Sequence, residues 1–263
     1  MYAFELHHAK SVADAAATLG KTGGKALAGG QSLVAAMKLR LAQPGHVVDL
    51  SGVPELKGIK KEGDHLVIGA MTRHAEVASS DVVKGAIPAL AALAEGIGDR
   101  QVRNMGTLGG SIANADPAAD WPAAVLALGA TVTTNKRKIG GDAFFTGMYE
   151  TALGADEIIV SVSFPVPKKA AYAKFPNPAS RFALVGTFVA QTAAGVRVAV
   201  TGAAPKVFRS KPLEDALAKS WSADAAKGVK IDAHGLNADL HGSPAYRAHL
   251  VAVMASRAVA AAR

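Results

Sequence analysis

Two glycine pairs, each followed by a segment of helical character, constrain this chain more than any other feature. The first pair lies in Ala28-Gly29-Gly30-Gln31-Ser32-Leu33, and the second lies in Gly106-Thr107-Leu108-Gly109-Gly110-Ser111. Glycine has no Cβ, so its backbone can adopt a positive φ and approach another group closely. The first N–H groups of a helix have no partner within it, and together with the helix dipole they attract anions. Each pair therefore predicts a turn whose backbone can bind a phosphate.

Two such turns in one chain favour a long ligand with a diphosphate in its middle, such as a dinucleotide. The nearest match to the fingerprint G-x-G-x-x-G is the segment Gly96–Gln101, which lacks the last glycine. A Walker A loop is excluded because Ala15 stands five residues before Gly20 where a glycine is required.

The segment around Ser32 also resembles the nucleophile elbow G-x-S-x-G of hydrolases. Val34 replaces the last glycine of that motif, which permits its sharp turn. Ser32 is therefore interpreted as a hydroxyl donor to a phosphate or as the N-cap of the following helix.

Composition sets further limits. The 263 residues allow one large domain or two to three small ones. The absence of cysteine excludes disulfides, a thiol nucleophile and any cysteine-ligated iron–sulfur cluster bound by this chain alone. Electron transfer through such a cluster would need another polypeptide.

The charge balance of 29 basic and 21 acidic residues gives a net charge of +8. The basic residues are scattered, and no basic stripe interleaved with aromatic residues indicates nucleic-acid binding. A solvated surface that attracts an acidic partner subunit is the favoured interpretation. The sequence shows neither a signal-peptide pattern nor an apolar run of about 18 residues, which predicts a soluble, cytoplasmic protein without a transmembrane segment.

The hydrophobic pattern predicts alternating helices and strands. Ser11 is a candidate N-cap and Gly20 a candidate helix end, and the proline- and lysine-rich segment 168–181 is the best candidate for a domain boundary. Helices are expected over 11–20, 33–41, 86–94, 118–128 and 243–262, strands over 25–28, 46–50, 131–134, 158–164, 183–191 and 195–200, and a hairpin over 56–68 with its turn at 62–64.

Several polar residues are candidates for binding. Asp116 and Asp120 follow the second glycine pair, and acid–base catalysis or a divalent metal site would use such paired carboxylates. A helix-capping role or a hydrogen bond to a sugar hydroxyl is favoured over both. The histidines are dispersed without a ligand motif such as HExxH, and His7-His8 is expected to be a surface pair.

At these segments the chain resembles a known family. The run from Ala28 to Leu41 is similar to the first FAD signature of the molybdenum hydroxylases, the xanthine dehydrogenase and carbon monoxide dehydrogenase family, in their FAD-binding medium subunit. The run from Arg103 to Asp120 is similar to the second signature. Further similarity at 174–185 and 246–250 extends the resemblance over essentially the whole chain, in family order.

The resemblance implies an α+β fold with two domains. Residues 1–173 would form a two-lobed FAD-binding domain of the vanillyl-alcohol-oxidase (PCMH) type, and residues 174–263 a smaller C-terminal α/β domain of the carbon monoxide dehydrogenase flavoprotein type. The FAD diphosphate would lie on Gly29–Leu33 and Thr107–Ser111, and Lys174 would lie near the flavin ring. The full set of implied FAD-binding residues is Ala28, Gly29, Gly30, Gln31, Ser32, Leu33, Thr107, Gly109, Gly110, Ser111, Asn114, Asp116, Asp120, Ile159 and Lys174.

The resemblance also implies a function. The chain would be the electron-transfer subunit of a heterotrimeric molybdenum hydroxylase, of the carbon monoxide dehydrogenase-like or aldehyde-oxidising branch, with no catalytic residue and no metal ligand of its own. A small subunit with [2Fe–2S] clusters and a large molybdopterin subunit would be its partners, in a dimer of heterotrimers. Two alternatives stay open at this point: a self-sufficient flavin oxidase of the same fold, and a basic nucleotide- or nucleic-acid-binding module.

Overall fold

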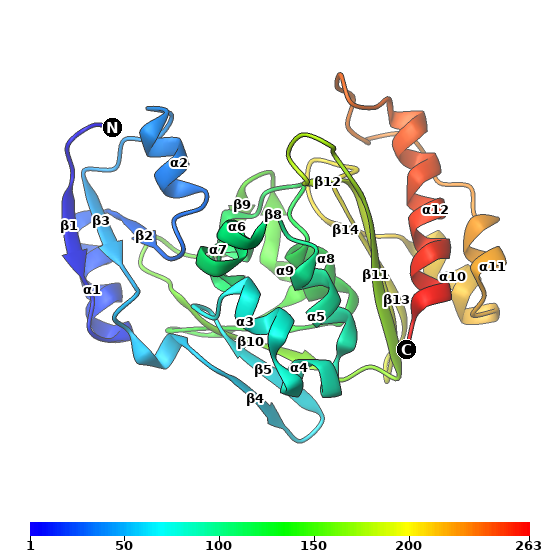
Figure 1. The fold of residues 1–263 in the computed structure, drawn as a ribbon, viewed down its shortest axis with the longest axis horizontal. Helices are drawn as coiled ribbons and strands as arrows, with labels where there is room; N and C mark the ends of the chain where they lie inside the picture. The colour runs from blue at the N-terminus through cyan, green and yellow to red at the C-terminus, as the bar shows by residue number, and fades with distance from the viewer.

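Three main β-sheets stand in a row along the long axis of the molecule, with helices beside and between them (Figure 1). The computed structural model describes residues 1–263. The N-terminal sheet lies at one end, a helix-rich middle region surrounds the second sheet, and the third sheet with the C-terminal helices forms the other end. The chain is therefore of mixed helix and sheet structure, as the sequence predicts.

The N-terminal sheet is parallel and has the strand order β1-β3-β2. Parallel neighbours need crossover connections, and one helix follows each of the first two strands. The strands predicted over 25–28 and 46–50 are confirmed. The elements are β1 (Glu5–His8), α1 (Val12–Thr22), β2 (Lys25–Leu27), α2 (Leu33–Lys38) and β3 (His46–Asp49).

The two ends of α1 test the capping predictions. Ser11 is the N-cap, as expected, and its hydroxyl accepts the N–H of Asp14 at 3.1 Å. The prediction that Gly20 ends the helix is wrong, because α1 continues through Gly20 to Thr22. The helix ends at Gly23, whose φ of +64° is the left-handed conformation that glycine adopts without strain.

The middle sheet is antiparallel throughout, with the order β4-β5-β10-β6-β7. The hairpin predicted with its turn at 62–64 is confirmed, since Glu62 of β4 pairs with His65 of β5. Its strands are β4 (Ile59–Glu62), β5 (His65–Gly69), β6 (Thr131–Thr134), β7 (Lys138–Gly140) and β10 (Ile159–Pro165).

Short helices lie on one side of this sheet (Figure 1), and its strands alternate buried and less buried residues. The helix predicted over 118–128 begins only at Trp121, because the residues before it form a turn in which the Asp116 carboxylate accepts the N–H of Ala118. The elements are a 3-10 helix at Pro54–Leu56, α3 (His74–Ser79), α4 (Asp81–Ala86), α5 (Pro88–Glu95), α6 (Arg100–Met105), α7 (Leu108–Asn114), α8 (Trp121–Ala127), α9 (Gly141–Phe144) and a small hairpin of β8 (Phe145–Gly147) and β9 (Glu150–Thr151).

The third sheet is antiparallel in the order β11-β12-β13-β14, and three helices complete the chain. The strands predicted over 183–191 and 195–200 and the last helix are confirmed. No helix in the structure has the length and apolar character needed to cross a membrane. The elements are β11 (Lys169–Pro176), β12 (Ala183–Thr192), β13 (Gly195–Thr201), β14 (Phe208–Arg209), α10 (Lys211–Lys219), α11 (Ala223–Lys227) and α12 (Pro244–Ala261).

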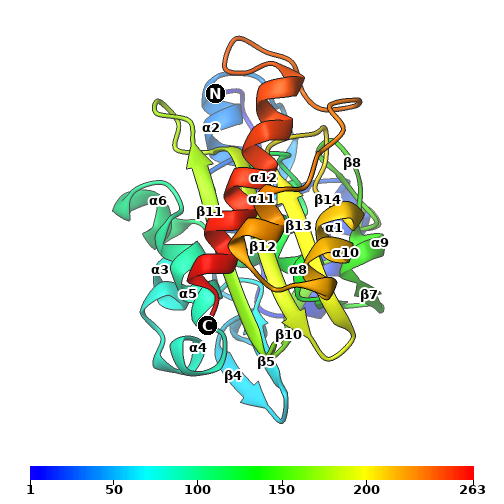
Figure 2. The ribbon, with the colours of Figure 1, turned by 90° about the vertical axis from the view of Figure 1, so that its right-hand side faces the viewer.

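Both faces of the third sheet are covered. Figure 2 shows α12 lying across β11 and β12, and α10 beside β13, on the face that points away from the middle region. Successive residues of a strand point to opposite faces. Phe188 accordingly joins the hydrophobic core of the middle region, whereas Val189 joins the core formed with Val251 and Met254 of α12.

The segment 168–181 was expected to link two domains, and most of it is instead the strand β11. This strand pairs with β12 from Lys169 opposite Gln191 to Pro176 opposite Ala183. The proline is accommodated because the register shifts just before it. The expected division after residue 173 therefore falls inside β11, and a division that leaves every strand whole lies between β10 and β11.

A buried polar pair lies in the core of the middle region. The indole Nε1 of Trp121 donates a hydrogen bond to Nδ1 of His74 at 3.1 Å, and the two side chains are almost fully buried. The backbone N–H of His74 donates to the carbonyl of Gly106, next to the second glycine pair. Burial, with a smaller effect of the Arg103 cation, lowers the pKa of His74 from 6.5 to about 4.

This lowered pKa predicts a loss of stability in acid. The unfolded chain binds a proton at His74 at a higher pH than the folded chain, so the free energy of unfolding should fall as the pH drops from 6.5 to about 4. The contribution of this residue is up to about 3 kcal/mol, from about 1.4 kcal/mol per pKa unit. Denaturant unfolding at neutral pH and at about pH 4.5 measures this change in the free energy of unfolding. The His74→Gln variant, which retains an acceptor for Trp121, should show a smaller pH dependence, and an unchanged dependence would contradict the assignment.

Candidate functional site

The structure brings the two glycine pairs together. A Cβ added to Gly29 would lie 2.6 Å from the carbonyl carbon of Met105 and 2.8 Å from the Cα of Gly106, both backbone atoms just before the second pair. A Cβ added to Gly110 would lie 3.4 Å from the Cβ of Ala28. These distances are shorter than ordinary van der Waals contacts or at their lower limit. The backbones of the two segments are therefore in direct contact, with no room for a side chain between them. They form one site, as a single ligand spanning both pairs would require.

The first segment offers free backbone donors. The N–H groups of Gly29 to Leu33 donate no hydrogen bond within the chain, and the segment is partly or fully exposed. Gly30 has a φ of +73°, which a residue with a side chain rarely adopts. A row of unpaired, accessible N–H groups before a helix is an anion-binding arrangement.

Ser32 lies within this row. Ser32 stands at the N-cap position of α2, as one alternative predicts, but its backbone is already helical and its side chain makes no capping hydrogen bond. No histidine or carboxylate hydrogen-bonds to its hydroxyl, and the nucleophile-elbow alternative finds no partner base in the chain. The exposed hydroxyl is left as a donor to a ligand. Gln31, next to it, is exposed in the same way.

The second segment uses its backbone differently. The hydroxyl of Thr107 caps α7 by accepting the N–H of Gly110 at 3.0 Å, and the N–H of Gly109 donates to the carbonyl of Ala70 at 2.8 Å. Gly109 is buried, and a Cβ on it would lie 2.6 Å from the Cβ of Ala70. Gly109 thus serves close packing of α7 against the end of β5. The half-buried side chains of Ser111 and Asn114, also on α7, make no hydrogen bond within the chain and are the donors that this segment can offer.

The two aspartates play separate roles. Asp116 stabilises the turn before α8, since its carboxylate accepts the N–H of Ala118 at 2.8 Å and the hydroxyl of Tyr149 at 3.4 Å. Asp120 is buried and faces β11 instead. The pair therefore does not form a common metal site, and neither carboxylate caps α8. Both accept hydrogen bonds within the chain, and a bond to a sugar hydroxyl stays a prediction.

Asp120 is the centre of a buried polar cluster. Its carboxylate accepts the hydroxyl of Tyr172 at 2.5 Å and the ammonium of Lys174 at 3.0 Å, and Lys174 also donates to the carbonyl of Gly96 at 2.8 Å. The side chains of Asp120 and Lys174 are 6% and 11% exposed. Burial raises the pKa of Asp120, and Lys174 and Tyr172 oppose that rise. Burial and the Asp120 charge together raise the pKa of Tyr172 well above its usual value.

Tyr172 is a member of this cluster that the sequence pattern did not single out. Tyr172 and Lys174 are two residues apart on β11, so their side chains lie on one face of the strand. This i, i+2 spacing predicts a shared face only in a strand, and the proline- and lysine-rich composition of segment 168–181 indicates a linker. Ile159, by contrast, is buried in the core of the middle region at the start of β10 and is not on the surface formed by the glycine segments.

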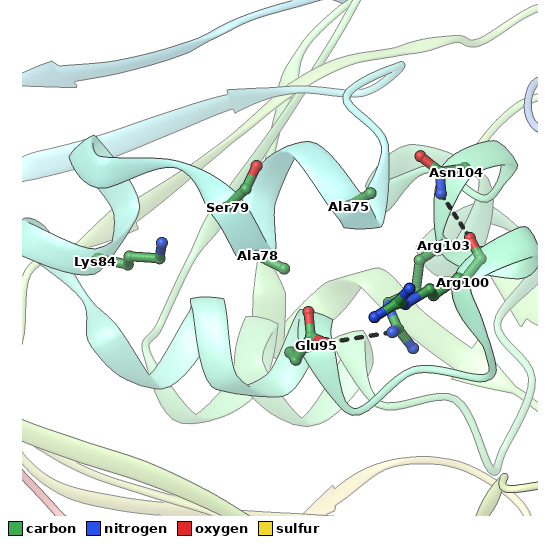
Figure 3. A pocket seen from close by; sticks show the side chains of 8 residues that line it. All are labelled: Ala75, Ala78, Ser79, Lys84, Glu95, Arg100, Arg103 and Asn104. Atoms are coloured by element: carbon green, nitrogen blue, oxygen red, sulfur yellow. Dashed lines mark hydrogen bonds and ion pairs between the residues drawn. The ribbon is translucent and has the colours of Figure 1, made fainter.

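Two cavities lie near these residues. One, of about 490 Å³, is lined by Asp116, Tyr149, Phe182 and other residues of the turn before α8 and the C-terminal region. The other, of about 420 Å³, lies among α3, α4, α5 and α6 (Figure 3). In it Arg103 pairs with Glu95 at 3.2 Å, and Arg100 lies close beside them. The first cavity is of a size that admits a ring system.

Comparison with known proteins identifies the family. A family model described as FAD binding domain in molybdopterin dehydrogenase matches residues 2–167. The carbon monoxide dehydrogenase medium chain of Hydrogenophaga pseudoflava is 38% identical over an alignment of 281 positions, gaps included, which covers 98% of this chain and 96% of that protein. The nicotine 6-hydroxylase medium subunit of Paenarthrobacter nicotinovorans is 38% identical over 249 residues, with 89% and 88% covered.

A solved structure shows the same fold. Reconstituted carbon monoxide dehydrogenase from Oligotropha carboxidovorans contains a chain that superposes with a TM-score of 0.92 at 32% identity, covering 98% of this chain and 97% of that one. The chain therefore belongs to the FAD-binding domain family of the molybdopterin dehydrogenases. The resemblance to the medium subunits of the molybdenum hydroxylases is confirmed, together with the oxidoreductase class and the FAD cofactor that it implied.

The buried cluster yields a testable prediction. Lys174→Met leaves the Asp120 carboxylate without its cation, and loss of one partner of a buried ion pair costs about 3–5 kcal/mol. Asp120→Asn in addition removes the stranded charge, so the double variant should be more stable than Lys174→Met alone. Denaturant unfolding of the wild type, Lys174→Met, Asp120→Asn and the double variant measures this coupling. Strictly additive effects would show that the two charges do not stabilise each other.

Proposed function

We propose that this chain is the flavoprotein subunit of a heterotrimeric molybdenum hydroxylase and passes electrons from the iron–sulfur clusters of a partner subunit through FAD to an external acceptor. The observation that carries the proposal is the meeting of the two glycine pairs, with a row of free N–H groups on one of them, inside the region that matches the FAD-binding family. Bound FAD would supply the step between one-electron and two-electron transfer.

Different residues of the chain contribute to FAD binding in different ways. The free N–H groups of Gly29 to Leu33 are suited to the FAD diphosphate, because they present partial positive charge without a side chain in the way. Ser111 and Asn114 are suited to hydrogen bonds with the same ligand. Thr107 and Gly109 act indirectly, by fixing α7 against the sheet so that Gly110 faces Ala28.

Lys174 is proposed to lie near the flavin ring, where a cation stabilises an anionic reduced ring and raises its potential. The ion pair with Asp120 limits this effect, since the carboxylate offsets much of the lysine charge at a distance. The same ion pair keeps the ammonium in one position, and Tyr172 keeps the carboxylate in one orientation.

The domain organisation follows the sheets. We propose a two-lobed FAD-binding domain of the PCMH type formed by the N-terminal sheet and the middle region, and a C-terminal domain that begins with β11, a few residues earlier than the expected start at 174. The absence of cysteine agrees with clusters carried by a small partner subunit, and the molybdopterin cofactor belongs to a large one. A dimer of heterotrimers and a cytoplasmic location stay predictions.

A visible absorption spectrum tests the function. The chain purified in its native complex should show oxidised-flavin and iron–sulfur bands, and the chain expressed alone should retain or bind FAD but lose the iron–sulfur absorption. A colourless chain that does not bind added FAD would overturn the proposal. Salt-dependent DNA binding by such a chain would favour the basic-module alternative instead.

A substitution in the first glycine segment tests the diphosphate site. Ser32→Asp places a carboxylate beside the free N–H groups, where it repels the diphosphate and competes for its donors. A unit charge at about 5 Å contributes roughly 1–3 kcal/mol at an effective dielectric constant of about 20–60, so FAD affinity should fall about 10- to 100-fold. Fluorescence titration of the apo chain with FAD measures the affinity.

Ser11→Asp is the matched control. Ser11 caps α1 in the same sheet region, and aspartate is as good an N-cap as serine. This control should bind FAD as the wild type does and should fold normally. Equal affinity of Ser32→Asp and the wild type would place the diphosphate elsewhere.

A further inference from the structure

A cluster of potential metal ligands lies at one end of the N-terminal sheet. Glu5 and His7 are two residues apart on β1, so their side chains lie on the same face of the strand. In the parallel register Glu5 is paired with His46 of β3, which brings the histidine beside both. The backbone of Gly24 packs against His46, since a Cβ on Gly24 would lie 2.7 Å from the His46 carbonyl oxygen and 3.0 Å from its Cβ.

The ligand atoms of the three side chains converge. Nε2 of His7 lies 3.1 Å from Nδ1 of His46, and the Oε2 atom of Glu5 lies 3.4 Å from Nδ1 of His46 and 3.9 Å from Nε2 of His7. Each residue thus contributes one nitrogen or oxygen atom to a common point. No other set of three such residues in the chain converges in this way.

These separations suit a tetrahedral ion. Histidine nitrogens and carboxylate oxygens bind Zn²⁺ at about 2.0–2.2 Å, which places ligand atoms of a tetrahedral site about 3.3–3.6 Å apart. The three separations in the structure bracket that range. Without an ion, the two imidazole nitrogens share one proton between them, because only one of the two can donate.

We propose that Glu5, His7 and His46 bind one divalent transition-metal ion, with Zn²⁺ the preferred occupant. Two imidazoles and one carboxylate favour zinc over magnesium or calcium, which prefer oxygen ligands alone. The fourth position faces solvent, as the side chains are 32%, 34% and 74% exposed for His7, His46 and Glu5. The ion would cross-link β1 to β3.

The site is separate from the proposed flavin function. It lies in the N-terminal sheet, and none of its ligands belongs to the glycine segments or to the Asp120 cluster. No local pattern indicates this site, because Glu5 and His7 are far from His46 along the chain. His7-His8 was expected to be a surface pair, and the structure separates its members: His8 pairs with Asp49 at 3.1 Å.

Zinc titration of the full-length chain without a polyhistidine tag tests the site. The chelator-treated chain is titrated with Zn²⁺ against a chromophoric competitor, and bound zinc is counted by atomic emission after gel filtration. The wild type should bind one equivalent. His7→Gln and His46→Gln should each weaken binding at least about tenfold, as loss of one ligand of three requires. Glu5→Gln, at a mostly exposed position that tolerates substitution, should weaken it as well.

His8→Gln is the matched control. It removes a neighbouring histidine from the same strand but not from the cluster, so it should bind zinc as tightly as the wild type. Cobalt substitution should give the intense visible bands of a tetrahedral site in the wild type and in His8→Gln only. A wild type that binds no more zinc than Glu5→Gln or His7→Gln would overturn the proposal, and so would an equal loss in His8→Gln.

Discussion

The buried contact between Asp120 and Lys174 ties together parts of the chain that are distant in sequence. The carboxylate belongs to the turn before α8, the ammonium to β11, and the second acceptor of the ammonium is the carbonyl of Gly96 after α5. Two desolvated charges are tolerated only when their attraction and hydrogen bonds offset the loss of water. Because the turn follows directly from α7, this contact fixes the third sheet relative to the second glycine segment. The geometry of the proposed FAD site therefore depends on it.

Local features could be predicted from the sequence. The glycine pairs, the hairpin turn at 62–64, the Ser11 cap and most strands depend on residues close together in the chain, where periodicity and turn chemistry act directly. The close approach of Gly29 to Met105 and Gly106 could not be predicted in this way, because no local pattern shows which backbone a glycine approaches. The presence of two such turns suggested one long ligand, and the resemblance to a family assigned both segments to FAD.

The features that escaped prediction are tertiary. Segment 168–181 has the composition of a linker, yet β12 pairs with its residues Lys169–Pro176, and this pairing overrides the proline. Gly109 carries the sequence signature of a phosphate loop, but Ala70 occupies the space beside it and accepts its N–H. Tyr172 could have been found from its spacing to Lys174 had the segment been recognised as a strand.

The third sheet separates two hydrophobic cores and belongs to both, since Phe188 faces one and Val189 the other. Loss of either core exposes apolar surface of the same strands, so the middle and C-terminal regions should open as one cooperative unit. The N-terminal sheet has a smaller core around Ala15, Leu19 and Val48, which Met71 and Ile158 at the edge of the middle region complete. A ligand bound where Gly29 meets the second segment would span a small cooperative unit and a large one. The binding energy of that ligand would also hold the N-terminal sheet against the rest of the molecule. Retention of the cofactor would therefore depend on the local stability of about the first fifty residues.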